Sequence, residues 1–150
     1  MNTVDCIKSR RSIRRFKPDS VKHSLIEEIV SAASFSPSWK NTQITRYIAI
    51  ETPVLIAVTY IKGRCGFERD GSYTTGKKDR WQMFDAGVAC QTFCLAAHEY
   101  GLGTVIMGVF DESGISSLLD IPKERELAAL IALGYPDIEP SAPKRKTVED

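Results

Sequence analysis

Three arginines and a serine lie within five residues near the start of the chain, as Arg10, Arg11, Ser12 and Arg14. Guanidinium groups make planar, bidentate hydrogen bonds to phosphate and stay charged at any physiological pH. A solvated helix end is the ordinary explanation for clustered charge, but this density of arginine favours a bound anion. The segment is therefore a candidate phosphate site.

A second polar segment follows the next predicted helix. Ser38, Asn41 and Gln43 place one hydroxyl and two amides just after Pro37. These groups donate and accept neutral hydrogen bonds, which suits the polar edge of a heterocycle better than a phosphate. A ligand with a phosphate at one end and a polar ring at the other would use both segments. Flavin mononucleotide (FMN) is such a ligand.

The composition indicates one globular domain. The chain has 150 residues, of which 43% are hydrophobic and 26% charged, and its net charge is only +1. A net charge this small gives no long-range electrostatic attraction to nucleic acid. We find neither an apolar run long enough to span a membrane nor a signal peptide. The four cysteines lack zinc spacing, so we expect reduced thiols, a cytoplasmic location and no metal site.

The apolar periodicity predicts alternating helices and strands, which indicates an α+β fold with a central sheet flanked by helices. Ser24 and Glu27 fit a capping box at the start of the second helix. The helix over 80–100 is apolar on nearly every side, so we expect it to be central or shared with a second chain. The predicted helices cover 3–9, 25–36, 80–100 and 111–119, and the predicted strands cover 44–50, 54–61, 104–110 and 127–133.

The segment from Lys62 to Asp79 has no periodicity and reads as a long surface loop that covers a ligand site. Gly71, Gly76 and Lys77 nearly spell a phosphate-binding P-loop, but Lys78 stands where a serine or threonine is needed and no buried strand precedes the motif. These departures disfavour a nucleotide triphosphatase, an alternative that predicts phosphate release dependent on Lys77. The aromatic side chains that we expect to shape an acceptor pocket are Phe67, Tyr73 and Trp81.

Several motifs together resemble the nitroreductase family of FMN-dependent oxidoreductases. They span nearly the whole chain in the family's order: 10–16 (RRSIRRF), 36–43 (SPSWKNTQ), 85–91 (DAGVACQ), 96–103 (AAHEYGLG), 133–136 (LGYP) and 143–146 (PKRK). The resemblance implies a single domain over 1–150 with a central, mostly antiparallel sheet and an extended dimer interface.

One departure from the family lies between Ile50 and Glu51, where family members usually carry about one more helix. Read locally, Glu51 to Pro53 is a three-residue hairpin loop between two strands. Read against the family, a helical segment is deleted or is missing from this sequence. We favour the missing segment.

The resemblance also assigns the site residues. It places Arg10, Ser12 and Arg145 near the flavin phosphate and ribityl chain, with Lys144 beside them and Arg11 in the same motif. It places Arg14 at the flavin N1 and O2 edge, where a fixed cation stabilises the charge that reduction creates.

The remaining assignments concern the flavin ring. Ser38 and Asn41 of a partner chain resemble the groups that bond its polar edge, and Ile106, Met107 and Gly108 resemble the segment beside N5. The implied protein is therefore a homodimer with FMN at the interface.

The implied reaction has two steps. NADH or NADPH transfers hydride to flavin N5, and an electron-poor acceptor such as a nitroaromatic or a quinone then takes the electrons. No catalytic side chain is needed, since the flavin carries the chemistry. Two alternatives stay open: the same fold with other flavin chemistry (a dehalogenase, a flavin destructase or a ring oxidase), and a non-enzymatic module that binds phosphate or nucleic acid.

Overall fold

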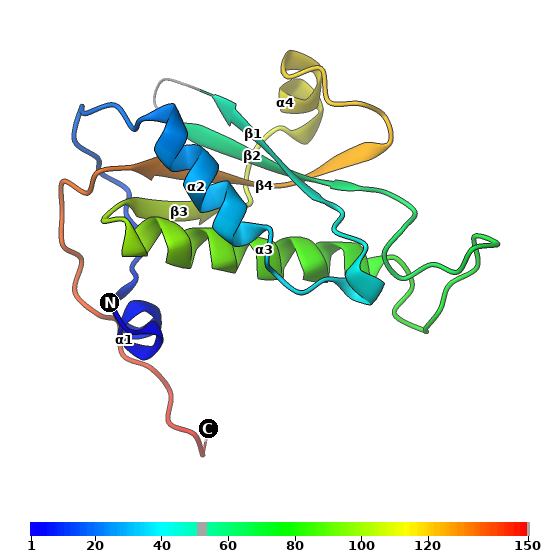
Figure 1. Cartoon of the computed structure of the whole chain (residues 1–150), viewed down its shortest axis with the longest axis horizontal. Coiled ribbons are helices and arrows are strands. Elements are labelled where there is room, and N and C mark those ends of the chain that lie inside the picture. Colours follow the sequence, from blue (N-terminus) through cyan, green and yellow to red (C-terminus); the bar gives the residue numbers. More distant parts are fainter. Residues whose placement is uncertain (51–53, 150) are drawn as a thin grey trace.

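The computed structural model describes residues 1–50 and 54–149, and the question raised at Ile50 and Glu51 lies outside this part of the chain. Figure 1 shows a sheet with helices on both faces. The helices are α1 (Thr3–Ser9), α2 (His23–Ala33), α3 (Arg80–Glu99) and α4 (Glu112–Leu118), with a short 3₁₀ turn at Trp39–Asn41. The strands are β1 (Thr45–Ile50), β2 (Leu55–Ile61), β3 (Gly103–Met107) and β4 (Arg125–Gly134).

The four strands form one antiparallel sheet in the order β1-β2-β4-β3. Thr45 pairs with Tyr60 at one edge, and Gly103 pairs with Gly134 at the other. β2 is buried along its whole centre, as its run of β-branched residues predicts. The α+β prediction with a mostly antiparallel sheet is therefore confirmed.

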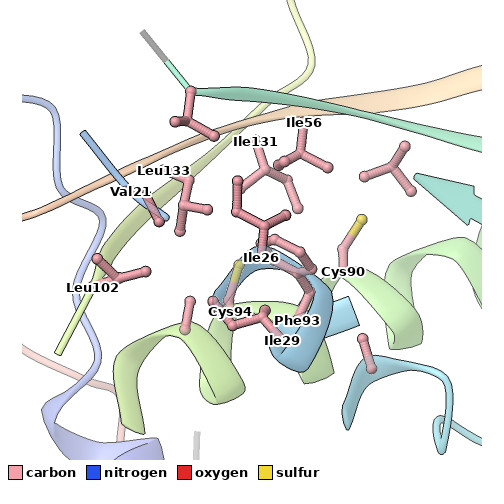
Figure 2. Close-up of a cluster of buried hydrophobic side chains, with 14 of the residues drawn as sticks. Val21, Ile26, Ile29, Ile56, Cys90, Phe93, Cys94, Leu102, Ile131 and Leu133 are labelled. Atoms are coloured by element: carbon pink, nitrogen blue, oxygen red, sulfur yellow. The ribbon is translucent and has the colours of Figure 1, made fainter. Parts of the chain in front are cut away.

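The main core lies between the sheet and the two longer helices. Ile29 of α2 and Phe93 of α3 are fully buried against Ile56 of β2 and Ile131 of β4 (Figure 2). A smaller cluster on the opposite face of the sheet packs beneath α4 (Figure 1). Because residues 56 and 57 point to opposite faces, β2 contributes to both clusters.

The capping box that the sequence predicts at Ser24 is wrong. α2 begins at His23, and its N-cap is Lys22, whose side chain makes no capping hydrogen bond. The helix is held instead by its apolar face, where Ile26 and Ile29 are buried. At α4 the N-cap is Asp111, whose side chain accepts from the Gly114 amide.

The arginine segment is fixed along the free edge of β3. Ser12 forms a parallel bridge with Thr104, and the Ile13 amide donates to the Thr104 carbonyl at 2.9 Å. Ile13 packs directly onto Gly103, where an added Cβ would lie 2.6 Å from Ile13 Cγ1. The glycine thus allows a close approach that no larger residue permits at this spacing, and it sets the position of the neighbouring Ser12 and Arg14.

Candidate functional site

The first half of the site is the end of α1 and the arginine segment. Arg10 is the C-cap of α1, and its Nε is buried with no hydrogen-bond partner among residues 1–50 and 54–149. A buried donor without a partner costs free energy, so this atom fits a group that binds an anion. Arg11 differs, because its guanidinium donates to the carbonyls of Lys8 and Arg10 at 2.6 and 2.9 Å.

A cavity of about 890 Å³ opens beside Arg10, between the end of α3 and residues 136–141. Arg10, Arg11 and Lys17 supply positive charge to its lining, and Asp137 and Glu139 supply negative charge. The volume is in the range of a cofactor site. The chain then runs on past α1 towards its C-terminus (Figure 1), and Lys144 and Arg145 are exposed on this last stretch.

His98 lines the same cavity from the last turn of α3. Burial, followed by the positive charge of Arg10, lowers the pKa of His98, and its Nε2 lies 2.7 Å from Ser9 Oγ. At neutral pH the imidazole therefore favours its uncharged form. Among the described residues that line this cavity, the cations are then Arg10, Arg11 and Lys17, with the Met1 ammonium group paired to Glu99.

The second half of the site is the polar turn after α2. Ser38 Oγ accepts from the Gln43 amide at 3.0 Å, and the Gln43 side chain donates to Asn41 Oδ1 at 3.1 Å. Ser38 and Gln43 line a separate cavity of about 630 Å³ whose apolar lining comes from α2, β1, β2 and α3. Trp39 Nε1 and Thr42 Oγ1 are buried without a partner in the described part of the chain.

The two halves lie towards opposite ends of α3. The Trp39 amide donates to Asp85 in the second turn of the helix at 2.8 Å, whereas Ser9 contacts His98 in its last turn. His98 lies thirteen positions after Asp85, which is about 20 Å along the axis at about 1.5 Å per residue. Within one chain Arg10, Ser12 and Arg14 therefore lie on the segment near the His98 end of α3, whereas Ser38 and Asn41 lie near its Asp85 end. Of the three, only Arg10 lines the cavity of about 890 Å³.

The third group of predicted site residues lies at the end of the edge strand β3. Ile106 is 46% exposed, which is unusual for an isoleucine in a strand, whereas Met107 packs on the cluster beneath α4. A Cβ added at Gly108 would meet nothing within 4 Å in this chain. The free space and the exposed isoleucine leave this end of β3 open to a ligand.

The loop that the sequence predicts over 62–79 is present, with a single isolated bridge between Phe67 and Tyr73. These two rings lie 5.0 Å apart. Trp81 of α3 lies 4.7 Å from the tilted ring of Trp39, and its Nε1 donates to Thr75 Oγ1 of the loop at 2.9 Å. Trp81 therefore contacts both the loop and the polar turn.

Cys65 is not an exposed loop thiol. It is fully buried, and burial, then its hydrogen bond to Asp85, raises its pKa to about 12. Such a thiol is unreactive. Sequence reasoning assigned no function to Asp85, although a carboxylate within an otherwise apolar stretch of helix is a signal that could have marked it.

The described residues contain no cluster of three or more histidine, cysteine or carboxylate side chains that could hold a metal ion. Cys90 and Cys94, one turn apart on α3, are buried in the main core. The same part of the chain has no helix that is long and apolar enough to cross a membrane.

Comparison with known proteins identifies the family. The nitroreductase family profile matches residues 7–65 and 51–135. The chain belongs to the nitroreductase family. Among its relatives, a Methanothermobacter thermautotrophicus protein named as an NADH dehydrogenase/NAD(P)H nitroreductase is 29% identical over 93% of this chain and 80% of its own length.

Solved structures share the fold of this family member. A nitroreductase family protein from Clostridium difficile 630 superimposes with a TM-score of 0.82 at 23% identity, covering 99% of this chain and 95% of its own. An FMN-dependent nitroreductase from Clostridium difficile R20291 gives a TM-score of 0.76 at 24% identity, over 95% and 92%. The resemblance and the fold inferred from the sequence are thereby confirmed.

Proposed function

We propose that this family member is an FMN-dependent oxidoreductase that takes hydride from NADH or NADPH and reduces electron-poor acceptors such as nitroaromatics or quinones. The observation that carries the proposal is the buried, unpartnered Nε of Arg10 beside a cavity of about 890 Å³. That donor has the chemistry a flavin phosphate requires. FMN is also named in one of the solved structures with this fold.

The phosphate end of the cofactor is held by Arg10 and Ser12, with Lys144 and Arg145 from the C-terminal stretch closing over it. Arg10 lines the cavity that residues 138–141 also line, and Lys144 follows three residues later. Three residues of extended chain reach about 10 Å, so the basic pair is within reach of the same anion. Arg11 supports this end indirectly, because its guanidinium caps the carbonyls of α1.

Exposed residues would contact the flavin ring. Arg14 is exposed beside the buried Ile13, so its charge is free to face the N1 and O2 edge of the flavin. Bound FMN would supply the hydride acceptor, at N5, and the electrons for the acceptor molecule. A fixed cation near N1 stabilises the negative charge of the reduced ring without reorganising. Ile106, Met107 and Gly108 would lie beside N5, where the end of β3 is open.

The site is completed by a second copy of the chain. Because α3 separates the polar turn from the arginine segment, the Ser38 and Asn41 that bond the ring edge come from the partner chain. α3 also exposes large apolar side chains, since Met83 and Phe84 are 49% and 60% exposed. Exposed apolar side chains on a central helix fit a contact between chains.

The first test is anaerobic stopped-flow of the purified protein reconstituted with FMN. We expect NADH or NADPH to bleach the flavin, and a nitroaromatic or a quinone to restore its colour. Protein that stays colourless after incubation with FMN would refute the proposal and favour a phosphate-binding module. Bound flavin that neither nucleotide reduces would indicate other flavin chemistry on the same fold.

The second test separates two neighbouring arginines. Arg14→Ala should bind FMN more weakly and slow its reduction by about 10- to 100-fold, because the charge at N1 loses its partner. Arg15→Ala is the matched control, since the Arg15 side chain is 70% exposed and pairs with Asp137 at 3.7 Å. Equal reduction rates in the two variants would contradict the role of Arg14.

A further inference from the structure

One buried carboxyl oxygen connects three parts of the chain. Asp85 is only 4% exposed, and its Oδ2 accepts from the Trp39 amide at 2.8 Å and from the Cys65 thiol at 3.0 Å. The first donor belongs to the polar turn, the second to the loop over 62–79, and the carboxyl itself to α3. The same oxygen therefore fixes the turn and the loop to the helix.

The polar turn needs such an anchor because its backbone is strained. Lys40, Asn41 and Gln43 have φ values of 44°, 55° and 46°, in the left-handed region that non-glycine residues rarely adopt. Strained backbone persists where the surroundings hold it, and it gathers at ligand sites. Ser38 Oγ holds the turn from within, at the Gln43 amide, and Asp85 holds it from outside.

The loop is fastened to the same end of α3 by further contacts. Gln82 Oε1 accepts from the Gly63 amide at 2.7 Å. Gly66 packs closely onto α3, because a Cβ added there would lie 3.3 Å from Trp81 Cβ, and it also packs within the loop, 2.5 Å from the Lys78 carbonyl oxygen. An exposed ion pair joins Lys40 of the turn to Glu68 of the loop at 3.1 Å. Turn and loop therefore form one unit on the first turns of α3, which we term the α3 hub (residues 36–43, 62–79, Gln82 and Asp85).

We propose that Asp85 is a positioning residue of the flavin site, which holds Ser38 and Asn41 in the geometry that bonds the polar edge of the partner chain's FMN ring. This inference rests on the proposed function and deepens it. A buried polar group is costly unless it is hydrogen-bonded, and the cluster around it is apolar, with Ile44 and Ala86 buried nearby. An apolar residue would pack there at lower cost, but it would leave the turn without its anchor.

The hub also ties the loop to the flavin edge. Trp81 of α3 contacts the Trp39 ring of the turn and donates to Thr75 of the loop. Asp85 likewise accepts from both the turn and the loop. A loop that shapes the acceptor site would therefore share its anchor with the groups that bind the ring. We accordingly expect a change at Asp85 to affect ring binding and acceptor affinity together.

The experiment compares Asp85→Ala with Asp85→Asn, whose amide oxygen still accepts from Trp39 and Cys65. Both are titrated with FMN and with riboflavin, which lacks the phosphate. Asp85→Ala should weaken both ligands by the same factor, about 5- to 30-fold, because one or two ring hydrogen bonds are lost. It should also shift the visible spectrum of the bound flavin, and Asp85→Asn should restore both properties to near the wild-type values.

Two controls separate position from folding. Asp120→Asn removes an exposed carboxyl beside α4 and should change neither ligand's affinity. Arg10→Ala should weaken FMN but not riboflavin, since it acts at the phosphate. If Asp85→Ala does not fold, Cys65→Ala carries the test: it removes one donor from the same oxygen, and we expect about a 2- to 5-fold loss for both ligands.

Unchanged riboflavin affinity in Asp85→Ala would overturn the inference. If Asp85→Ala does not fold, unchanged riboflavin affinity in Cys65→Ala would overturn it. Equal losses in Asp85→Ala and Asp85→Asn would overturn it as well, because the hydrogen bonds would then not be the cause. Both results leave the proposed function intact when the wild-type protein binds FMN and is reduced. Wild-type protein that binds no flavin would instead refute the proposed function itself.

Discussion

Gly103→Ala should displace the arginine segment. The new Cβ would lie 2.6 Å from Ile13 Cγ1 and 2.8 Å from Ile13 Cβ, whereas carbon atoms pack at about 3.5–4.0 Å. Because Cβ is bound to the backbone, a rotamer change cannot relieve the clash, and residues 12–14 must move by about 1 Å. Overpacking of this kind costs about 1–3 kcal/mol, which lowers Tm by roughly 2–12 °C for a chain of this size.

The displacement should reach the cofactor. A misplacement of about 1 Å costs up to about 100-fold where geometry matters, so we expect FMN affinity or the rate of flavin reduction to fall by about 10- to 100-fold. FMN titration and stopped-flow reduction measure these effects, and calorimetry measures Tm. The control is Gly76→Ala, where the added Cβ meets nothing within 4 Å.

The double variant Gly103→Ala with Ile13→Ala tests the cause. Removing the two γ carbons of Ile13 relieves the shortest contact, so the double variant should lose less stability than the two single losses combined. Strict additivity would refute the packing explanation. Wild-type stability and FMN affinity in Gly103→Ala would refute the claim that this glycine sets the position of the segment.

Three further predictions follow from described contacts. Arg10→Ala should lose far more FMN affinity than Arg11→Ala, because Arg11 uses its guanidinium on two carbonyls; equal losses by titration would contradict this. Burial raises the pKa values of Cys65 and Cys90 from 9.0 to about 12. Between about pH 9 and about pH 12 the folded state therefore keeps protons that the unfolded state releases, so the free energy of unfolding should fall as pH rises through this range. Urea unfolding at about pH 8 and about pH 10 should show a shallower loss in Cys65→Ala than in wild type, and an unchanged slope would contradict it. Mixing Arg10→Ala with Asn41→Leu subunits should restore FMN reduction, because one of the two sites in the mixed dimer is intact; no recovery after subunit exchange would count against a shared site.

The elements that the sequence predicts best are those with a strong local signal. The β-branched run at 54–61 and the long apolar segment at 80–100 become β2 and α3 almost residue for residue. The start of α2 is predicted less well, because burial of Ile26 and Ile29 decides it and no side chain caps the helix. The serine and glutamate spacing there is a local pattern that tertiary packing overrides.

The candidate site also has parts with a strong local signal in the sequence and parts that only tertiary packing creates. The clustered arginines predict an anionic ligand from the sequence alone, and the structure places their segment along the edge strand β3. Asp85 and Cys65 lie twenty residues apart, and only the fold shows that they share a hydrogen bond of 3.0 Å. The sequence places Cys65 in an exposed loop, whereas the structure buries it completely.

The rigid span of α3 has a consequence for how this protein would be handled. If each flavin is bound by residues near opposite ends of α3 in two chains, the amount of FMN bound per chain measures how much of the protein is dimeric. Dilution that separates the subunits would release the cofactor even where every arginine is intact. An FMN affinity measured at a single protein concentration would therefore depend on dimer dissociation as much as on the contacts with FMN.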